Sequence, residues 1–300
     1  MSKPRQILPG STYLITRRTE RRHMLLRPDE AMNQNMIYLL AISARRYGIL
    51  VHGFVVMSTH IHLVITDVRG VLPRFLNDFH RLGALTTKVL RKWEGSVWDH
   101  GQTSVVRLAT NEAVDNAIAY TLANPVTAGL VRNAREWPGA KSDVDDLGGG
   151  VMHARRPSVF LNPRNRRWTP TATLTLALPP HVEPSRANEW REAVKAKLAE
   201  YEERGRKEVA LQEWNVLGAR RAAKVSPYQR ATSFEPIRSR DPTFAVGGVA
   251  GAYLAAVCAL RAFRAAYSAA LDRWRAGFRY TVFPAGTWLM ARLHSASVAT

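Results

Sequence analysis

The sequence predicts an α+β fold in which helices pack against a ferredoxin-like antiparallel sheet. Segments with strand-like and helix-like apolar patterns follow one another within the first 142 residues in the order strand, helix, strand, strand, helix, strand, helix. Two of these strands are separated by only two residues, which favours a hairpin. The order is that of a split β-α-β arrangement, from which we predict the sheet.

The pattern begins with a predicted strand over residues 12–17 and continues with a helix. Pro28, Asp29 and Glu30 open this helix, because proline suits a first turn and acidic side chains favour the positive end of the helix dipole. Gly48 ends it. Its apolar stripe comprises Met36, Ile37, Leu40, Ala41, Ala44 and Tyr47.

A hairpin and a second helix come next. Residues 49–57 and 60–66 are predicted strands, and they should pair because only Ser58 and Thr59 lie between them. Pro73 begins a helix with two distinct faces. The apolar face comprises Phe75, Leu76, Phe79, Leu82, Leu85, Val89, Leu90 and Trp93, and a basic stripe comprises Arg74, Arg81 and Lys88.

The last strand and helix of the pattern lie just before the end of this region. The strand covers residues 103–108, and the helix begins near Asn111. We expect the helix to end at Asn124, because a residue that precedes a proline, here Pro125, disfavours the helical conformation.

Composition divides the chain into three parts. Residues 1–142 should form the ferredoxin-like domain, and residues 143–185, rich in Pro, Gly and Arg, are predicted to be a linker. Residues 186–300 should be a basic, mainly helical C-terminal region, with helical patterns over 186–216 and 246–276. The sequence indicates no role for this last region.

One segment of the C-terminal region is uncharged. Residues 243–260 include Gly247 and Gly251, are only marginally long enough to span a membrane, and run directly into Arg261 and Arg264. We therefore expect the start of a buried helix and no membrane partner.

The net charge of +19 is extreme for 300 residues, with 43 Lys and Arg against 24 Asp and Glu. Such an excess indicates a polyanionic partner, most often nucleic acid, although a genome-wide preference for arginine is an alternative explanation. The single cysteine, Cys258, excludes an intramolecular disulfide and fits a reducing compartment. Because the N-terminus also lacks an apolar signal region, we expect a cytoplasmic protein.

His60 and His62 form the most informative pattern in the chain. Side chains alternate along a strand, so both imidazoles should lie on one face and Ile61 on the other. Two neighbouring imidazoles can bind one metal ion. Tyr120 and Asn124 are four residues apart in the third predicted helix, so they should share a helix face.

These four residues together suit phosphoryl transfer. Two imidazoles and an amide oxygen can hold a divalent ion that polarises a phosphate. A tyrosine hydroxyl nearby could attack phosphorus, and the covalent phosphotyrosine would store the bond energy for rejoining. Such a site suits strand cleavage and transfer better than hydrolysis. The alternative is four structural roles: two solvent-facing histidines, a core tyrosine and an asparagine that caps a helix.

Two segments resemble a known family. Residues 57–64 (MSTHIHLV) are similar to the His-hydrophobic-His signature of single-tyrosine HUH transposases, and residues 120–131 (YTLANPVTAGLV) are similar to their nucleophile helix. The second segment resembles, more narrowly, REP-associated tyrosine transposases. The resemblance covers about residues 9–142, and it departs where Ser58 and Thr59 replace the Pro-Asn that often precedes the first histidine.

This resemblance implies a DNA transposase or endonuclease that cleaves and transfers single-stranded DNA near palindromic hairpins. It implies a Mg or Mn ion and a 5′-phosphotyrosine link to Tyr120. We expect His60 and His62 to bind that ion, with Asn124 as the third ligand because it lies one helical turn from Tyr120. The implied partner is single-stranded or hairpin DNA, the implied location is the nucleoid of a bacterial cytoplasm, and a homodimer is left open. Separately, we expect basic side chains to contact the DNA backbone: Arg17, Arg18, Arg21 and Arg22 after the first strand, and Arg74, Arg81 and Lys88 on the second helix.

Two other functions stay open at this point. A DNA- or RNA-binding regulator on the same fold would need no catalytic turnover, but it would have no reason to keep all four candidate site residues. A replication-initiation or relaxase nuclease would use similar chemistry, but such proteins usually carry a longer histidine cluster.

Overall fold

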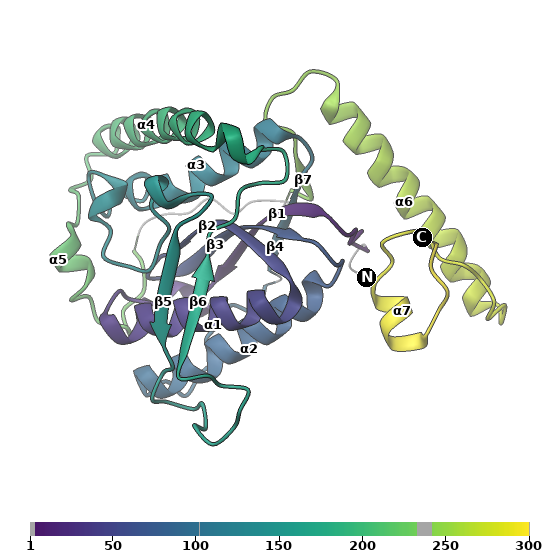
Figure 1. Ribbon diagram of the computed structural model, residues 1–300, viewed down its shortest axis with the longest axis horizontal. Helices are drawn as coiled ribbons and strands as arrows, with labels where there is room; N and C mark the ends of the chain where they lie inside the picture. Colours follow the sequence, from purple (N-terminus) through teal and green to yellow (C-terminus); the bar gives the residue numbers. More distant parts are fainter. Residues whose placement is uncertain (1–3, 102, 233–241, 300) are drawn as a thin grey trace.

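A central sheet with helices on both faces organises the protein (Figure 1). The computed structural model describes residues 4–101, 103–232 and 242–299. The strands lie in the order β2-β3-β1-β4-β7. Their bounds are β1 Ser11–Arg18, β2 Ile49–Val56, β3 His60–Asp67, β4 Ser104–Leu108 and β7 Phe244–Ala245.

The first four strands confirm the predicted ferredoxin-like arrangement. β3 pairs antiparallel with β2 on one side and with β1 on the other, and β1 also pairs antiparallel with β4. Chain order and sheet order together match the split β-α-β arrangement. The fifth strand, β7, comes from the C-terminal region and pairs in parallel with β4, so the complete sheet is mixed.

Helices cover both faces of the sheet. α1 and α2 lie on one face; α3 lies on the other, and α4 packs on the side of α3 that faces away from the strands (Figure 1). The apolar face of α2 is buried as predicted at Phe75 and Phe79, but Val89 is 49 % exposed because it lies on the outer side of the helix. The bounds are α1 Glu30–Tyr47, α2 Leu72–Arg91, α3 Asn111–Thr127 and α4 Ala187–Leu211.

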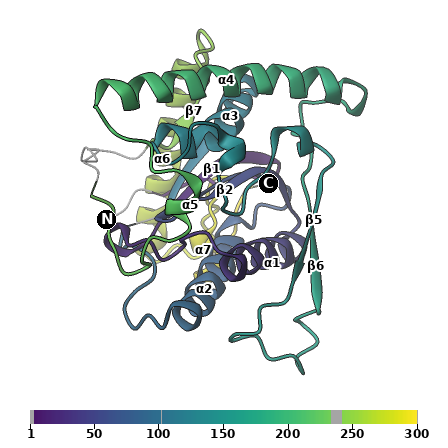
Figure 2. The ribbon, with the colours of Figure 1, turned by 90° about the vertical axis from the view of Figure 1, so that its left-hand side faces the viewer.

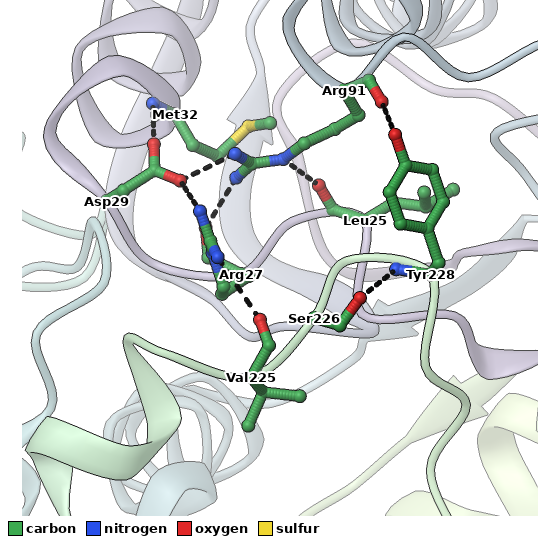
Figure 3. Close-up of polar contacts among 8 residues, drawn as sticks. All are labelled: Leu25, Arg27, Asp29, Met32, Arg91, Val225, Ser226 and Tyr228. Atoms are coloured by element: carbon green, nitrogen blue, oxygen red, sulfur yellow. Dashed lines mark hydrogen bonds and ion pairs between the residues drawn. The ribbon is translucent and has the colours of Figure 1, made fainter.

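A polar network fixes the start of α1 against the end of α2 (Figure 3). Asp29 caps α1 by accepting a hydrogen bond from Met32 N at 2.9 Å, and it also pairs with Arg91 at 2.5 Å and Arg27 at 3.0 Å. Burial would raise the pKa of Asp29, but these hydrogen bonds outweigh it and hold the pKa below its usual value. Tyr228, from the segment that follows α4, donates to Arg91 O at 2.6 Å.

The predicted end of the third helix is wrong. α3 continues through Pro125 to Thr127, and Gly129 then adopts a left-handed conformation with φ +66°. A proline this close to the C-terminus removes only one helical hydrogen bond. Val126 in the last turn is only 1 % exposed and packs against the protein core. Ala128 N donates a helical hydrogen bond to Asn124 O at 3.0 Å.

Residues 143–185, which we expected to be a linker, are folded. β5 (Val151–Arg155) and β6 (Thr171–Thr175) form an antiparallel pair beside α1 (Figure 2). Leu174 and Leu176 are 3 % and 0 % exposed and belong to the same hydrophobic core as β1 and β3. The core therefore extends beyond residue 142, because the hairpin buries an apolar side that its Pro- and Gly-rich flanks obscure in the sequence.

The C-terminal region is helical as expected, but the uncharged segment does not begin a buried helix. Part of that segment forms β7, and α6 (Ala252–Arg275) begins beside β7 and extends along the side of the molecule with most of its surface exposed (Figure 1). α6 is long and apolar enough to cross a membrane by length and composition alone, and only 17 % of its apolar window is buried. The remaining short elements are η1 Glu20–Arg22, η2 Ala134–Glu136, η3 Val144–Asp146, η4 Pro184–Arg186, α5 Ala219–Ala222 and α7 Leu289–His294.

A buried polar chain crosses three strands of the sheet. His52 donates from Nδ1 to Ala177 O at 2.9 Å, and its Nε2 accepts from Thr66 Oγ1 at 2.7 Å. Thr66 in turn bonds Thr12 Oγ1 at 2.7 Å. Burial lowers the pKa of His52 to about 4, so the imidazole is neutral in the folded protein.

His52 should make the stability depend on pH. Below its unfolded pKa of about 6.5, the unfolded chain gains a proton that the folded chain binds only near pH 4. The free energy of unfolding should therefore decrease as the pH is lowered from about 6.5 to about 4, by up to about 3 kcal/mol from this residue. Urea unfolding of wild type and His52→Gln at about pH 7 and about pH 4.5 measures the difference.

Two other histidines matter for this experiment, one as a second source of pH dependence and one as a control. His80 is also buried, with its pKa lowered to about 3, so His52→Gln should keep part of the pH dependence. The side chain of His100 is 87 % exposed, so His100→Gln should behave like wild type. An equal loss of stability on acidification in wild type and His52→Gln would contradict the assignment.

Candidate active site

The two histidines of the sequence motif lie on the face of β3 that α3 covers. In the strand register His60 is opposite Arg18 and His62 is opposite Thr16, and residues opposite each other in a sheet point to the same side. Ile61 faces the other side and is fully buried. β3 therefore has one apolar face and one face that carries imidazoles.

α3 brings Tyr120 and Asn124 to the same place. His60 Nε2 and Asn124 Oδ1 are 3.2 Å apart. The ring centroids of His60 and His62 are 4.8 Å apart with perpendicular planes, and the His62 and Tyr120 centroids are 5.7 Å apart. The structure thus places all four predicted site residues in one contact group.

Two threonines orient the imidazoles. Thr16 Oγ1 hydrogen-bonds His62 Nδ1 at 2.9 Å, and Thr59 Oγ1 hydrogen-bonds His60 Nδ1 at 3.0 Å. Hydrogen bonds of this kind on one ring nitrogen fix the orientation and tautomer of a histidine that binds metal through the other nitrogen. Thr59 directly precedes His60 in the chain, and its hydroxyl supports the imidazole of His60 directly.

The geometry of these donors fits a divalent ion. Two ligands at right angles on an octahedral ion, each at about 2.1 Å, lie about 3 Å apart. The 3.2 Å between His60 Nε2 and Asn124 Oδ1 matches that spacing. In the part of the chain that the structure describes, no three His, Cys, Asp or Glu side chains gather as a metal group. An ion here would have His60, His62 and the amide of Asn124 as its protein ligands.

Two of the four site residues are buried, and the other two are partly accessible to solvent. His62 and Asn124 are 5 % and 6 % exposed, whereas His60 and Tyr120 are only half-buried. Burial keeps His62 and Asn124 in a fixed geometry. The partial exposure of Tyr120 allows a large substrate to reach its hydroxyl.

The arginines after the first strand do not act as one group. Arg18 lies on the same sheet face as His60, but Arg17 lies on the other face, where it donates to Asp99 O at 3.0 Å and Gly101 O at 2.5 Å. Arg21 and Arg22 follow in η1, with φ values of +46° and +58°. Among these four predicted DNA contacts, Arg18 has the position closest to the site in the strand register.

The basic stripe of α2 is separated from the histidines by the sheet. α2 covers the face opposite α3, so Arg74, Arg81 and Lys88 do not line the candidate site (Figure 1). Arg81 is already paired with Asp78 at 3.1 Å, and Lys88 donates to Glu94 O at 3.4 Å. If this stripe contacts DNA, it does so at a second surface.

Two further residues reach the site from α4. The centroid of the Tyr201 ring is 6.1 Å from that of Tyr120, and Arg204 Cζ lies 5.5 Å from the Tyr201 centroid. Tyr201 and Arg204 lie within residues 186–216, a predicted helical segment to which the sequence assigns no role. No local motif marks either residue, because their proximity to Tyr120 arises only when α4 packs on α3.

Comparison with known proteins gives structural similarity only. No family model and no curated protein matches the chain. It is similar to the structure of a REP-associated tyrosine transposase bound to a REP hairpin, with a TM-score of 0.41, 18 % identity, and coverage of 49 % of this chain and 85 % of that one. It is also similar to a transposase candidate from Deinococcus radiodurans R1, with a TM-score of 0.28, 20 % identity, and coverage of 35 % and 85 %.

The threonine that supports His62 offers a test of this geometry. Thr16→Val keeps the shape of the side chain but removes the hydroxyl, so His62 should lose its orientation and Mn²⁺ affinity should fall by about 10- to 100-fold. Calorimetric titration with Mn²⁺ measures this, and Thr16→Ser is the control that keeps the hydroxyl. Equal Mn²⁺ affinity in Thr16→Val and wild type would show that the hydrogen bond does not serve a metal ligand.

Proposed function

We propose that this protein is a metal-dependent, transposase-like nuclease that cleaves single-stranded DNA and transfers strands through a 5′-phosphotyrosine on Tyr120. Sites near hairpin-forming palindromes are the proposed targets. The observation that carries the proposal is the contact group itself: His60, His62, Asn124 and Tyr120 meet across two elements far apart in sequence. Four independent structural roles would not require them to meet.

The proposed cofactor is Mg²⁺ or Mn²⁺, held by His60, His62 and Asn124. When bound, such an ion would polarise the scissile phosphate and offset its negative charge. Residues of the chain position the metal ligands and the nucleophile. Thr16 and Thr59 hold the imidazoles, and the α3 backbone keeps Tyr120 one helical turn from Asn124.

The chemistry conserves the number of phosphoester bonds. The oxygen of Tyr120 attacks phosphorus, the bond from phosphorus to the 3′ oxygen breaks, and that oxygen leaves as a hydroxyl after taking a proton. The tyrosine proton passes to water. In the reverse direction, a 3′ hydroxyl attacks the phosphotyrosine, forms a new phosphodiester and releases Tyr120, so no external energy source is needed.

The proposed partner is single-stranded or hairpin DNA in a bacterial cytoplasm, and the net charge of +19 supports a polyanion. A binding regulator without turnover is the second candidate. It is disfavoured because a binding surface does not need a tyrosine in ring contact with a histidine that a threonine orients.

Tyr120→Phe tests the nucleophile. The substitution removes only the hydroxyl and keeps the ring that contacts His62, so folding and DNA binding should survive. The covalent adduct with a labelled hairpin oligonucleotide, seen as an SDS-resistant gel shift, should disappear. An adduct that persists in this variant would exclude Tyr120 as the nucleophile.

Asn124 tests the metal site. Asn124→Asp keeps an oxygen ligand and should retain Mn²⁺ binding, whereas Asn124→Leu keeps the volume but removes the ligand and should weaken Mn²⁺ binding by at least about tenfold. Calorimetry measures the affinity, and the melting temperature checks that each variant folds. Unchanged Mn²⁺ affinity in Asn124→Leu would reduce Asn124 to a structural residue of α3.

A further inference from the structure

We propose that α4 forms one wall of the active site, where Tyr201 positions the ring of Tyr120 and Arg204 binds a phosphate of the DNA strand. This inference rests on the proposed function and extends it to a region that lies outside the family resemblance. It assigns α4 a part in the reaction.

The packing of α4 on α3 is too close to be a loose contact. A Cβ added to Gly205 would lie 2.9 Å from Thr127 Cα, so the two backbones meet directly at this glycine. Next to this crossing, Glu202 is 8 % exposed and accepts a hydrogen bond from Ala134 N at 2.7 Å. A buried carboxylate bonded to the segment after α3 fixes the register between the helices.

The other end of α4 is anchored as well. Trp190 Nε1 donates to Asp115 Oδ1 at 2.8 Å, and Lys197 Nζ pairs with Glu112 Oε1 at 2.6 Å. Both acceptors lie on α3. Figure 2 shows α4 running along α3 on the outer side of the sheet. Contacts at both ends therefore hold the intervening residues of α4 at a fixed distance from the site.

The ring of Tyr120 contacts aromatic side chains from both sides of α3. Its plane is nearly perpendicular to that of His62, at 81°, and lies at 70° to that of Tyr201. Edge-to-face contacts of this kind restrict the rotation of a ring. Because a nucleophile must meet phosphorus along a defined line, restricting the Tyr120 ring lowers the entropic cost of reaching that geometry.

Arg204 differs from the basic residues that follow it on α4. Arg206 pairs with Glu202 and Lys207 pairs with Glu203, at 3.7 Å and 2.6 Å. In the described part of the chain no carboxylate forms an ion pair with Arg204, whose exposed guanidinium lies over the Tyr201 ring. Its charge is therefore available to an anion.

The guanidinium of Arg204 and the aromatic ring beneath it fit a phosphate of single-stranded DNA. A guanidinium can bind two phosphate oxygens at once, and an arginine over an aromatic ring is typical of surfaces that hold single-stranded nucleic acid. A phosphate of a strand joined to Tyr120 would lie beside Tyr201. We infer that Arg204 contacts the DNA backbone near the scissile bond.

The Arg204 contact is tested by binding in a Tyr120→Phe background, where no covalent step occurs. Fluorescence anisotropy with a labelled single-stranded oligonucleotide gives affinity at several salt concentrations. Arg204→Ala should weaken binding several-fold and lower the log-log salt slope by about 0.7, the value for one phosphate contact. Lys207→Ala is the matched control, since it removes the same charge from the same helix but from a paired residue. If Arg204→Ala matches Lys207→Ala in affinity and slope, the contact does not exist.

The role of Tyr201 is tested by separating rate from affinity. Tyr201→Phe keeps the ring and should form adduct at the wild-type rate. Tyr201→Leu should slow adduct formation by about tenfold or more even at saturating DNA, where any change in DNA affinity no longer affects the rate. Tyr201→Met serves as a second truncation if the leucine variant does not fold. A wild-type rate in a folded truncated variant, or an equal loss of rate in Tyr201→Phe, would overturn the positioning role.

These measurements also separate this inference from the proposed function. If wild type binds DNA but forms no adduct, the proposed chemistry fails and the positioning role of Tyr201 fails with it. The Arg204 contact is still decided in that case, because it is read from binding alone.

Discussion

The pairing of β3 on both of its edges is the constraint on which the site depends. With β1 on one side and β2 on the other, the register of β3 is fixed along its whole length. A slip by one residue would turn His60 and His62 toward the apolar core under α1 and α2, and Ile61 toward α3. The burial of the apolar face thus holds the imidazoles on the opposite face. The positions of the imidazoles are well defined because the burial of apolar side chains in the core fixes the register of β3.

The second half of the site depends on a helix that passes through a proline. Because α3 continues to Thr127, Asn124 keeps helical geometry one turn after Tyr120 and can face His60. A helix that ended at Asn124 would leave that amide in a mobile last turn. The final turn is held by its burial and by the close approach of Gly205 on α4. The same contact that stabilises the helix end brings Tyr201 and Arg204 beside the nucleophile.

Net charge predicted a nucleic-acid partner but could not locate the interface. Many arginines already pair with carboxylates of the protein itself: Asp78 alone pairs with the partly exposed Arg46, Arg81 and Arg167. Burial would raise the pKa of Asp78, but hydrogen bonds from Tyr47 and Arg81 and the nearby arginines hold it below its usual value. An arginine paired in this way must give up or share its carboxylate partner before it can bind a phosphate. The ones available to DNA are those without a carboxylate partner, and only the folded chain reveals which they are.

The sequence by itself determined the strands β1 to β4, the existence of the helices α1 to α3, the hairpin of β2 and β3, and the residues that could do chemistry. These depend on local periodicity and on residue type, which a linear pattern contains. The tertiary structure alone decided that residues 143–185 fold, that α3 continues past Pro125, and that the basic stripe of α2 lies across the sheet from His60. It also decided that Tyr201 lies beside Tyr120. The physical reason is the same in each case: burial against distant elements outweighs local propensity, and no local pattern records which distant element will supply it.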